Sequence, residues 1–236
     1  MALSLVAIYE YMHAFNKGGH HPGLSNGIIF TAGAFVVLRF APLHWVAAFL
    51  ALSLLALFAQ YVLDKKMELQ DVMITITGYL YPSLILLGIA WAGSSADIRW
   101  YIILLTALII AMGTDTFAYL TGLLIGRTPL APSISPKKTI EGSIGGSVIA
   151  VCLVVGAGFL YRRYAGIYIP IAHLIIIGLL GSLAGQIGDL FASKIKRACG
   201  IKDFGQIIPG HGGIMDRIDS ITLVFIVVAS YMAVVL

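Results

Sequence analysis

The chain has 236 residues, of which 59% are hydrophobic and only 11% charged, and its mean hydropathy is +0.96. Soluble domains are usually about 45–50% apolar and about 25% charged. This composition therefore excludes an ordinary soluble protein and predicts an integral membrane protein. The formal net charge of +4 is typical of a membrane protein with basic cytoplasmic loops and does not favour nucleic-acid binding. The two cysteines, Cys152 and Cys199, lie in unlike settings and predict no disulfide framework.

Residues 2–15 form an apolar segment that is too short to cross a membrane and that carries Glu10 between two tyrosines. It predicts a helix at the membrane interface, or the cytoplasmic end of a longer element, and it lacks the pattern of a signal peptide. Seven longer apolar runs follow, each sufficient to cross the hydrocarbon core as a helix. They cover residues 24–40, 44–63, 72–92, 100–125, 143–161, 169–191 and 218–236. The predicted fold is therefore all-α, a polytopic transmembrane helix bundle with about 7–8 membrane helices.

The distribution of lysine and arginine over alternate loops predicts the orientation. The richer side, expected to be cytoplasmic, holds Lys17, Lys65, Lys66, Arg127, Lys137, Lys138, Lys194, Lys196, Arg197, Lys202 and Arg217, and the other side holds Arg39, Arg99, Arg162 and Arg163. Both long polar loops, 126–142 and 192–217, then face the cytoplasm, where a soluble nucleotide could reach them.

Four of the eleven acidic residues lie in short loops, and we expect these four, Asp64, Glu68, Asp71 and Asp97, to be solvated surface charges. Asp115 differs, because it lies within an otherwise apolar helix, where a carboxylate costs a few kcal/mol unless it faces a polar cavity or a partner.

Three further carboxylates are expected to reach one membrane surface from two consecutive helices. Asp189 lies near the end of one helix, and Asp216 and Asp219 share a face at the start of the next. Such acids repel one another unless cations neutralise them, and all-oxygen ligands favour a hard ion such as Mg²⁺. The alternative is ion pairing, of Asp189 with Lys196 or Arg197 and of the others with nearby basic residues. We consider metal binding at Asp189, Asp216 and Asp219 the stronger hypothesis.

Both polar loops have the composition of phosphate sites. The loop 192–217 combines basic residues with glycines, whose backbone amides can approach a phosphate closely. In the loop 126–142, Pro136 is expected to set a bend before Lys137 and Lys138, and Thr139 and Glu141 to cap a helix whose free N–H groups could bind a triphosphate. A basic loop that only binds anionic lipid headgroups, or that only sets topology, is the alternative.

Histidines show no metal-ligand spacing. His211 is nevertheless a candidate, because it is flanked by glycines inside the charged loop. There it could contact a phosphate or serve merely as a turn residue.

The string from Ser193 to Asp219, SKIKRACGIKDFGQIIPGHGGIMDRID, resembles the C-terminal signature of the phosphatidate cytidylyltransferases. The fixed positions of that signature are matched by Ser193, Lys196, Arg197, Lys202, Asp203, His211, Gly212, Gly213, Asp216, Arg217 and Asp219. The string DTFAYLTGLLIGRTPLAPSISPKKTIEGSIGG is also similar to the family, so the resemblance covers about residues 100–236. Relatives commonly have another spanning helix before the run that ends here at Tyr9 and Glu10, which leads us to expect a late start.

The resemblance implies N-terminal membrane helices in 1–99 and a catalytic membrane domain in 100–236 that makes CDP-diacylglycerol from CTP and phosphatidate. It implies Mg²⁺ on Asp189 and Asp216 with Asp219 close by, and K⁺ can share that site. The expected triphosphate ligands are Lys137, Lys138, Lys196, Arg197 and Arg217, with Gly212 and Gly213 in the same substrate site, and the lipid phosphate is expected near Ser193, Lys202 and His211. No general base is required, because phosphatidate is already anionic.

The expected partners are CTP, phosphatidate and membrane lipids, with no nucleic acid. Homodimerisation is compatible with such a family and is not visible in the sequence. The expected location is a bacterial inner membrane, crossed several times, with the active site facing the cytoplasm. A CTP-dependent lipid kinase is the nearest alternative, and a transporter or a lipid-binding scaffold are alternatives of another class.

Overall fold

The computed structural model describes residues 1–42, 44–94, 97–207 and 212–235. Its helices and strands are α1 (Ala2–Lys17), α2 (Leu24–Phe40), α3 (His44–Leu63), α4 (Leu69–Gly78), η1 (Tyr79–Leu84), α5 (Ile85–Gly93), α6 (Ile98–Ile125), β1 (Pro129–Ala131), β2 (Ser135–Thr139), α7 (Ile140–Leu160), η2 (Tyr161–Ala165), α8 (Ile171–Ala198) and α9 (Met215–Val235). The protein is thus a mostly helical, polytopic membrane protein. Among these described residues, six helical stretches are long and apolar enough to cross a membrane, and α2 is a shorter apolar helix.

Within the described residues, the seven predicted apolar runs fall almost entirely on helices, but only six stretches qualify as candidate spans, fewer than the 7–8 membrane helices predicted. One run contains an irregular turn in its middle. The segments α4, η1 and α5 together form the candidate span Leu69–Gly93. Its middle, η1, is a π-helical turn around Pro82. Proline has no N–H for the helical ladder, and a wider turn is one way for a helix to accommodate it.

Two expectations about the polar loops need correction. The loop 126–142 contains an antiparallel hairpin, β1 paired with β2, so the fold is not purely α, and Pro136 lies within strand β2 instead of at a bend. The helix α8 continues to Ala198, beyond the predicted end at 191, which shortens the loop that follows. Residues 192–198 are mostly good helix formers, and Lys196 and Arg197 interact favourably with the helix C-terminus.

Packing divides the chain into two units. The first comprises Met1–Trp91 with Ile195–Arg217, and the second comprises Ala92–Lys194 with Ile218–Leu236. The segment after α8 therefore packs with the N-terminal helices. The functional division predicted at residue 100 stays a prediction.

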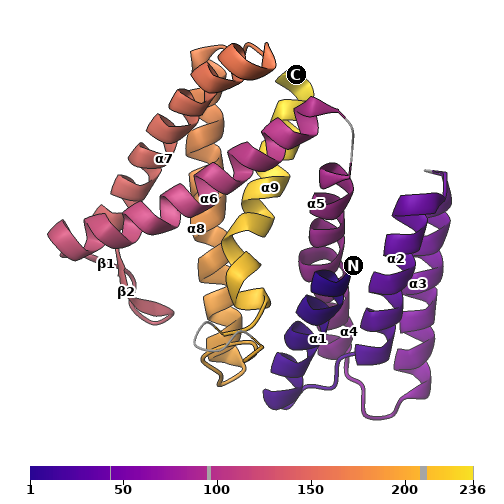
Figure 1. The fold of residues 1–236 in the computed structure, drawn as a ribbon. Helices are drawn as coiled ribbons and strands as arrows, with labels where there is room; N and C mark the ends of the chain where they lie inside the picture. Colours follow the sequence, from indigo (N-terminus) through magenta and orange to yellow (C-terminus); the bar gives the residue numbers. More distant parts are fainter. Residues whose placement is uncertain (43, 95–96, 208–211, 236) are drawn as a thin grey trace. The chain divides into compact units, whose positions relative to one another are not determined.

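In the first unit, α1 to α5 surround one apolar core (Figure 1). Its centre is a stacked pair, Phe30 and Tyr79, with ring centroids 3.9 Å apart, and Leu57 and Val72 are buried beside it. Asp71, predicted to be a surface charge, is only 2% exposed. Its carboxylate accepts hydrogen bonds from the N–H groups of His21 and Glu68, which explains how the charge can be buried.

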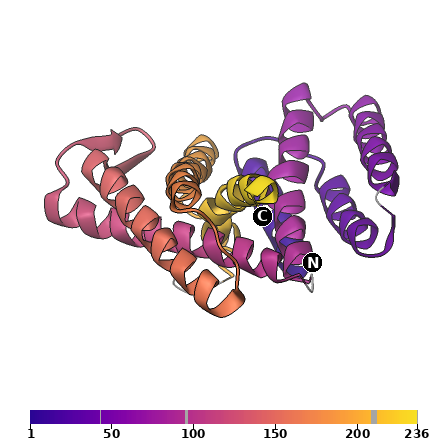
Figure 2. The same ribbon diagram turned by 90° about the horizontal axis from the view of Figure 1, so that it is seen from above.

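In the second unit, α6 and α7 lie against each other (Figures 1 and 2). Glycine lies at their contact. A Cβ added at Gly146 of α7 would meet the Thr114 carbonyl oxygen of α6 at 2.7 Å and the Ala118 Cβ at 2.9 Å. Glycine thus lets the two backbones approach closely, which is a common way for membrane helices to associate.

The Gly146→Ala variant is expected to be less thermally stable than the wild type in detergent, because the added methyl group overlaps the α6 backbone and overpacking costs about 1–3 kcal/mol. The matched control is Gly156→Ala in the same helix, where an added Cβ meets nothing within 4 Å. Melting temperatures of both variants check this. An equal or higher melting temperature is expected for the control, and equal destabilisation of both would contradict the packing argument.

Candidate functional site

The hairpin before α7 is held to the first turn of that helix. Thr139 caps α7 by accepting a hydrogen bond from the Gly142 N–H at 3.1 Å, as the sequence predicted. The Glu141 carboxylate accepts hydrogen bonds from the N–H groups of Arg127 and Thr128 and from the Thr128 hydroxyl. These bonds hold both ends of the hairpin against the first turn of α7. The strand that carries the basic residues therefore has a defined position relative to that helix.

The hairpin brings Lys138 to the predicted site and leaves Lys137 exposed. Successive side chains of a strand point to opposite faces, so only one of the two lysines can face α8. Lys138 forms an ion pair with the Asp189 carboxylate of α8. The Ser193 hydroxyl lies one turn further along α8, 3.4 Å from the other Asp189 oxygen. Asp189 thus has an ion-pair partner in the structure, which is Lys138 of the hairpin and not Lys196 or Arg197.

Asp115 lies in the same group, which we call the Asp189 group: Asp115, Lys138, Asp189 and Ser193. Asp115 of α6 lies near Asp189, Lys138 and the Ser220 side chain of α9. Its side chain is exposed at the surface of the second unit. An acid in the interior of an apolar helix requires polar surroundings, and this group supplies them.

A strip of polar side chains extends from the Asp189 group between α7 and α8. The Gln186 amide nitrogen donates to the Ser147 hydroxyl at 2.9 Å and to the Ser143 carbonyl at 3.3 Å, and the Ser143 hydroxyl donates to the Gln186 oxygen. Each polar group therefore has a partner inside otherwise apolar helices. Hydrogen bonding of this kind both joins membrane helices and holds a polar surface in place.

Asp219 lies at the same level of the second unit as Asp189. A Cβ added at Gly188 would lie 2.5 Å from the Asp219 carbonyl oxygen, so the backbones of α8 and α9 approach closely there. The Ser220 N–H donates to the Asp219 carboxylate at 2.8 Å. Two of the three predicted metal ligands are thus carried by adjacent turns of neighbouring helices.

Asp216, the third predicted ligand, belongs to the first unit and is 4% exposed. One carboxylate oxygen is 2.7 Å from the Lys196 ammonium, and the other accepts hydrogen bonds from the N–H groups of Phe204 and Gly213 at 2.9 and 3.0 Å. We call these residues the Asp216 group: Lys196, Phe204, Gly213 and Asp216. The convergence of Asp216 with Asp189 stays a prediction.

The remaining predicted residues occupy different settings. Arg197, Lys202 and Arg217 are exposed. Gly212 has φ +81°, a conformation that favours glycine, and a Cβ added there would lie 3.1 Å from an Asp216 carboxylate oxygen. His211 lies outside the described residues.

The residues present fit a hard divalent cation in their chemistry. They offer carboxylate and hydroxyl oxygens, the donors that Mg²⁺ prefers. Among the described residues, no group of three or more His, Cys, Asp and Glu side chains gathers as a metal site. Mg²⁺ usually binds through one or two carboxylates and completes its shell with water and substrate phosphates, so a preformed cage of three acids is not required.

Sequence reasoning missed Glu10 as a functional candidate. Glu10 of α1 is 2% exposed, and its carboxylate accepts a hydrogen bond from the Met215 N–H, immediately before Asp216. Burial raises the pKa of this carboxyl above its ordinary value, and hydrogen bonds from the N–H groups of Met215 and Ile214 oppose that increase. A lone acid in an apolar run was a usable signal, because such a residue needs a partner elsewhere in the chain.

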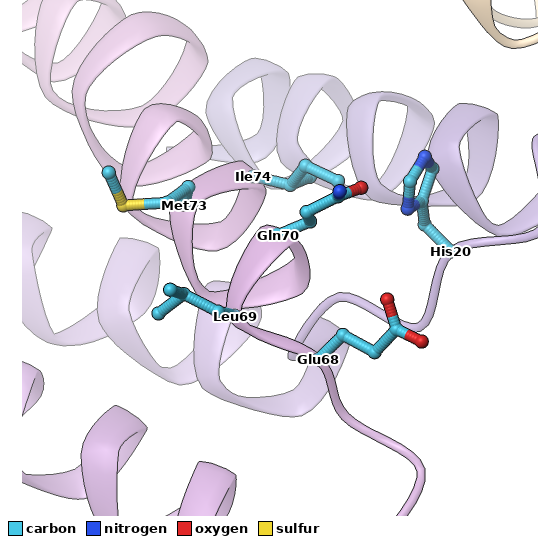
Figure 3. A pocket seen from close by; sticks show the side chains of 6 residues that line it. All are labelled: His20, Glu68, Leu69, Gln70, Met73 and Ile74. Atoms are coloured by element: carbon cyan, nitrogen blue, oxygen red, sulfur yellow. The ribbon is translucent and has the colours of Figure 1, made fainter.

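A separate pocket of about 560 Å³ lies in the first unit and contains none of the predicted site residues. It is lined by His20, Glu68, Leu69, Gln70, Met73 and Ile74. Figure 3 shows the polar ends of His20 and Glu68 on one side of the opening and the side chains of Leu69 and Met73 on the other. The charged groups that resemble a phosphate site lie elsewhere.

The fold and these groups define a class: a polytopic helical membrane protein with paired acids and lysines beside a glycine-containing loop. The comparison with protein families is more specific. The chain belongs to the cytidylyltransferase family, whose family model matches residues 1–235.

Named relatives agree with this family. The chain is 44% identical over 118 residues to the phosphatidate cytidylyltransferase of Bacillus subtilis (strain 168), a match that covers 50% of this chain and 42% of that protein. It is 46% identical over 121 residues to the phosphatidate cytidylyltransferase of Staphylococcus aureus (strain COL), covering 51% of this chain and 45% of the relative. The matched part thus spans somewhat less than half the length of these relatives.

Proposed function

We propose that the protein is a phosphatidate cytidylyltransferase, which makes CDP-diacylglycerol and pyrophosphate from CTP and phosphatidate. The observation that carries the proposal is the Lys138–Asp189 ion pair, which joins the basic hairpin to an acid of α8 in a chain of the cytidylyltransferase family. The relatives that share 44–46% identity with this chain carry that enzyme name.

In the proposed reaction, a phosphate oxygen of phosphatidate attacks the α-phosphorus of CTP. The bond from that phosphorus to the oxygen bridging to the β-phosphate breaks, and pyrophosphate leaves with the bonding electrons. Such chemistry needs alignment of two anions and neutralisation of developing charge more than covalent help. Lys138, Lys196, Arg197 and Arg217 would supply that positive charge, and Lys137, although exposed, remains in the predicted set.

The predicted cofactor is Mg²⁺, held by Asp189 and Asp216 with Asp219 nearby, and K⁺ can share the site. When bound, the metal would neutralise charge on the phosphates and orient them. The proposed location is a bacterial inner membrane, with the hairpin and the segment 199–214 on the cytoplasmic side, as the positive-inside pattern predicts.

The fate of labelled CTP tests this function against its nearest alternatives. Purified protein with phosphatidate and Mg²⁺ is expected to transfer label into lipid from CTP labelled at the α-phosphorus, and none from CTP labelled at the γ-phosphorus. Transfer of the γ label would instead identify a lipid kinase. Absence of both, together with counterflow of a solute across liposomes, would support a transporter.

Removal of divalent cations is expected to lower the rate of label transfer by roughly 100-fold or more, because two anionic substrates would then meet beside acidic side chains. The measurement compares the rate before and after treatment with EDTA, and then after addition of Mg²⁺ or of Ca²⁺. Recovery with Mg²⁺ is expected. An EDTA-treated enzyme that keeps its full rate would remove the metal from the proposal.

A further inference from the structure

Glu10 is a buried acid that the proposed reaction does not use. One carboxylate oxygen, Oε2, accepts the Met215 N–H at 2.9 Å, at the first turn of α9. The other oxygen, Oε1, is buried and has no hydrogen-bond partner within the described part of the chain. A buried acceptor left in this way costs about 1–3 kcal/mol, so packing alone is a poor reason for a carboxylate here.

Two glycines make room for this carboxylate. A Cβ added at Gly205 or at Gly213 would overlap the Glu10 carboxylate atoms. In the segment after α8, the backbone at Gly205 and the backbone at Gly213 therefore both lie directly against the Glu10 side chain of α1. Only residues without a side chain can approach it so closely.

The same helix also touches the beginning of that segment. A Cβ added at Gly18, just after α1, would lie 3.2 Å from the Cα of Cys199, the first residue after α8. Cys199 is 6% exposed. Hence α1 contacts the segment at Cys199, at Gly205 and at Gly213 to Met215, and all of these residues belong to the first unit.

The backbone held by Glu10 is the backbone that holds Asp216. Gly213 contacts the Glu10 carboxylate and donates its N–H to Asp216, and Gly205 follows Phe204, whose N–H also binds Asp216. Met215, which donates to Glu10, directly precedes Asp216 in the chain. A change at Glu10 would thus be transmitted to the orientation of Asp216 through two short backbone links.

We infer that Glu10 is a positioning residue, which orients Asp216 and its partner Lys196 by fixing the backbone around Gly205 and Gly213. This inference rests on the proposed function, in which Asp216 and Lys196 contact the metal and the phosphates. Glu10 itself touches neither substrate. Outer residues that orient a ligand typically contribute 10–100-fold to metal affinity or activity.

The experiment compares Glu10→Ala, Glu10→Gln and Glu10→Asp with the exposed-acid control Asp64→Asn, in full-length protein with CTP and phosphatidate. Glu10→Ala is expected to lower kcat by roughly 10–100-fold while KM for phosphatidate changes less than about threefold. Glu10→Asp keeps the acceptor and should restore part of kcat. Glu10→Gln is the variant of nearly the same shape, for use if Glu10→Ala does not fold.

A second measurement does not depend on activity. In a Cys152→Ser background, Cys199 is the only thiol, and burial raises its pKa and slows its reaction with a maleimide. Release of the segment from α1 in Glu10→Ala is expected to raise the labelling rate of Cys199 by about fivefold or more, with an unchanged circular dichroism spectrum. A smaller increase is expected in Glu10→Gln, because its amide oxygen can still accept the Met215 N–H.

The two measurements together decide the inference. A lower kcat with faster labelling, partly reversed in Glu10→Asp, supports it. An unchanged labelling rate, or faster labelling with an unchanged kcat, overturns it. If the wild-type protein transfers no label from CTP, the proposed function fails, and the labelling rate alone then decides whether Glu10 fixes the segment.

Discussion

Asp216→Asn is expected to lower the rate of label transfer from CTP by roughly 100-fold or more, a loss comparable to removing a main electrostatic contributor in other enzymes. Asp216 is almost buried, and its two oxygens accept hydrogen bonds from the Lys196 ammonium and from two backbone N–H groups. Asparagine has nearly the same shape but offers one oxygen and one NH₂ group. The NH₂ group of asparagine would then face either the Lys196 ammonium or the two backbone N–H groups, which are all donors, so a hydrogen bond is lost. The negative charge that would hold a cation is also lost.

The matched control is Asp64→Asn, which neutralises an exposed acid elsewhere in the first unit. It should keep the wild-type rate. Circular dichroism and the melting temperature show whether both variants fold. A folded Asp216→Asn protein that works at the wild-type rate would remove Asp216 from the metal site and from catalysis.

Hydropathy predicted most of the fold because a membrane helix must be apolar over its whole length and must satisfy its own backbone hydrogen bonds. Within the described residues, the seven predicted runs are almost entirely helical, and six of them correspond to candidate spans. The β1–β2 hairpin was not predicted, since its five-residue strand SPKKT has no alternation of polar and apolar residues. The helical end of α8 was missed because Ser193 to Arg197 read as a charged loop, although such residues suit a helix C-terminus.

Pattern and charge gave a set of candidate site residues, which stays a prediction, but not the partners that those residues have in the structure. As the alternative to metal binding, the sequence offered Asp189 a partner in the loop that follows, Lys196 or Arg197, whereas the structure pairs it with Lys138, 51 positions away. The Glu10–Met215 hydrogen bond likewise joins residues 205 positions apart, a contact that neither periodicity nor motif spacing can indicate. Asp71 was assigned to the surface because its hydrogen-bond donors, His21 and Glu68, come from a loop and a helix cap that hydropathy does not describe.

The second large effect is expected at Lys138. Lys138→Met keeps the length of the side chain and removes its charge, so Asp189 loses its ion-pair partner while Asp115 remains nearby. We expect kcat/KM for CTP to fall by roughly 10–100-fold, because the developing phosphate charge loses a cation and the two acids repel each other. Lys137→Met should have a smaller effect, since Lys137 is exposed and lies on the opposite face of β2.

A double-mutant cycle with Asp189→Asn separates two roles of Lys138. If Lys138 acts only by pairing with Asp189, the double variant should be no worse than Asp189→Asn alone, because the pair is already lost. If Lys138 also binds the triphosphate, as we propose, the double variant should lose a further factor in kcat/KM for CTP. Equal effects of Lys137→Met and Lys138→Met would contradict the assignment of Lys138 as the residue that joins the hairpin to α8, and a wild-type rate in Lys138→Met would contradict its role in the reaction.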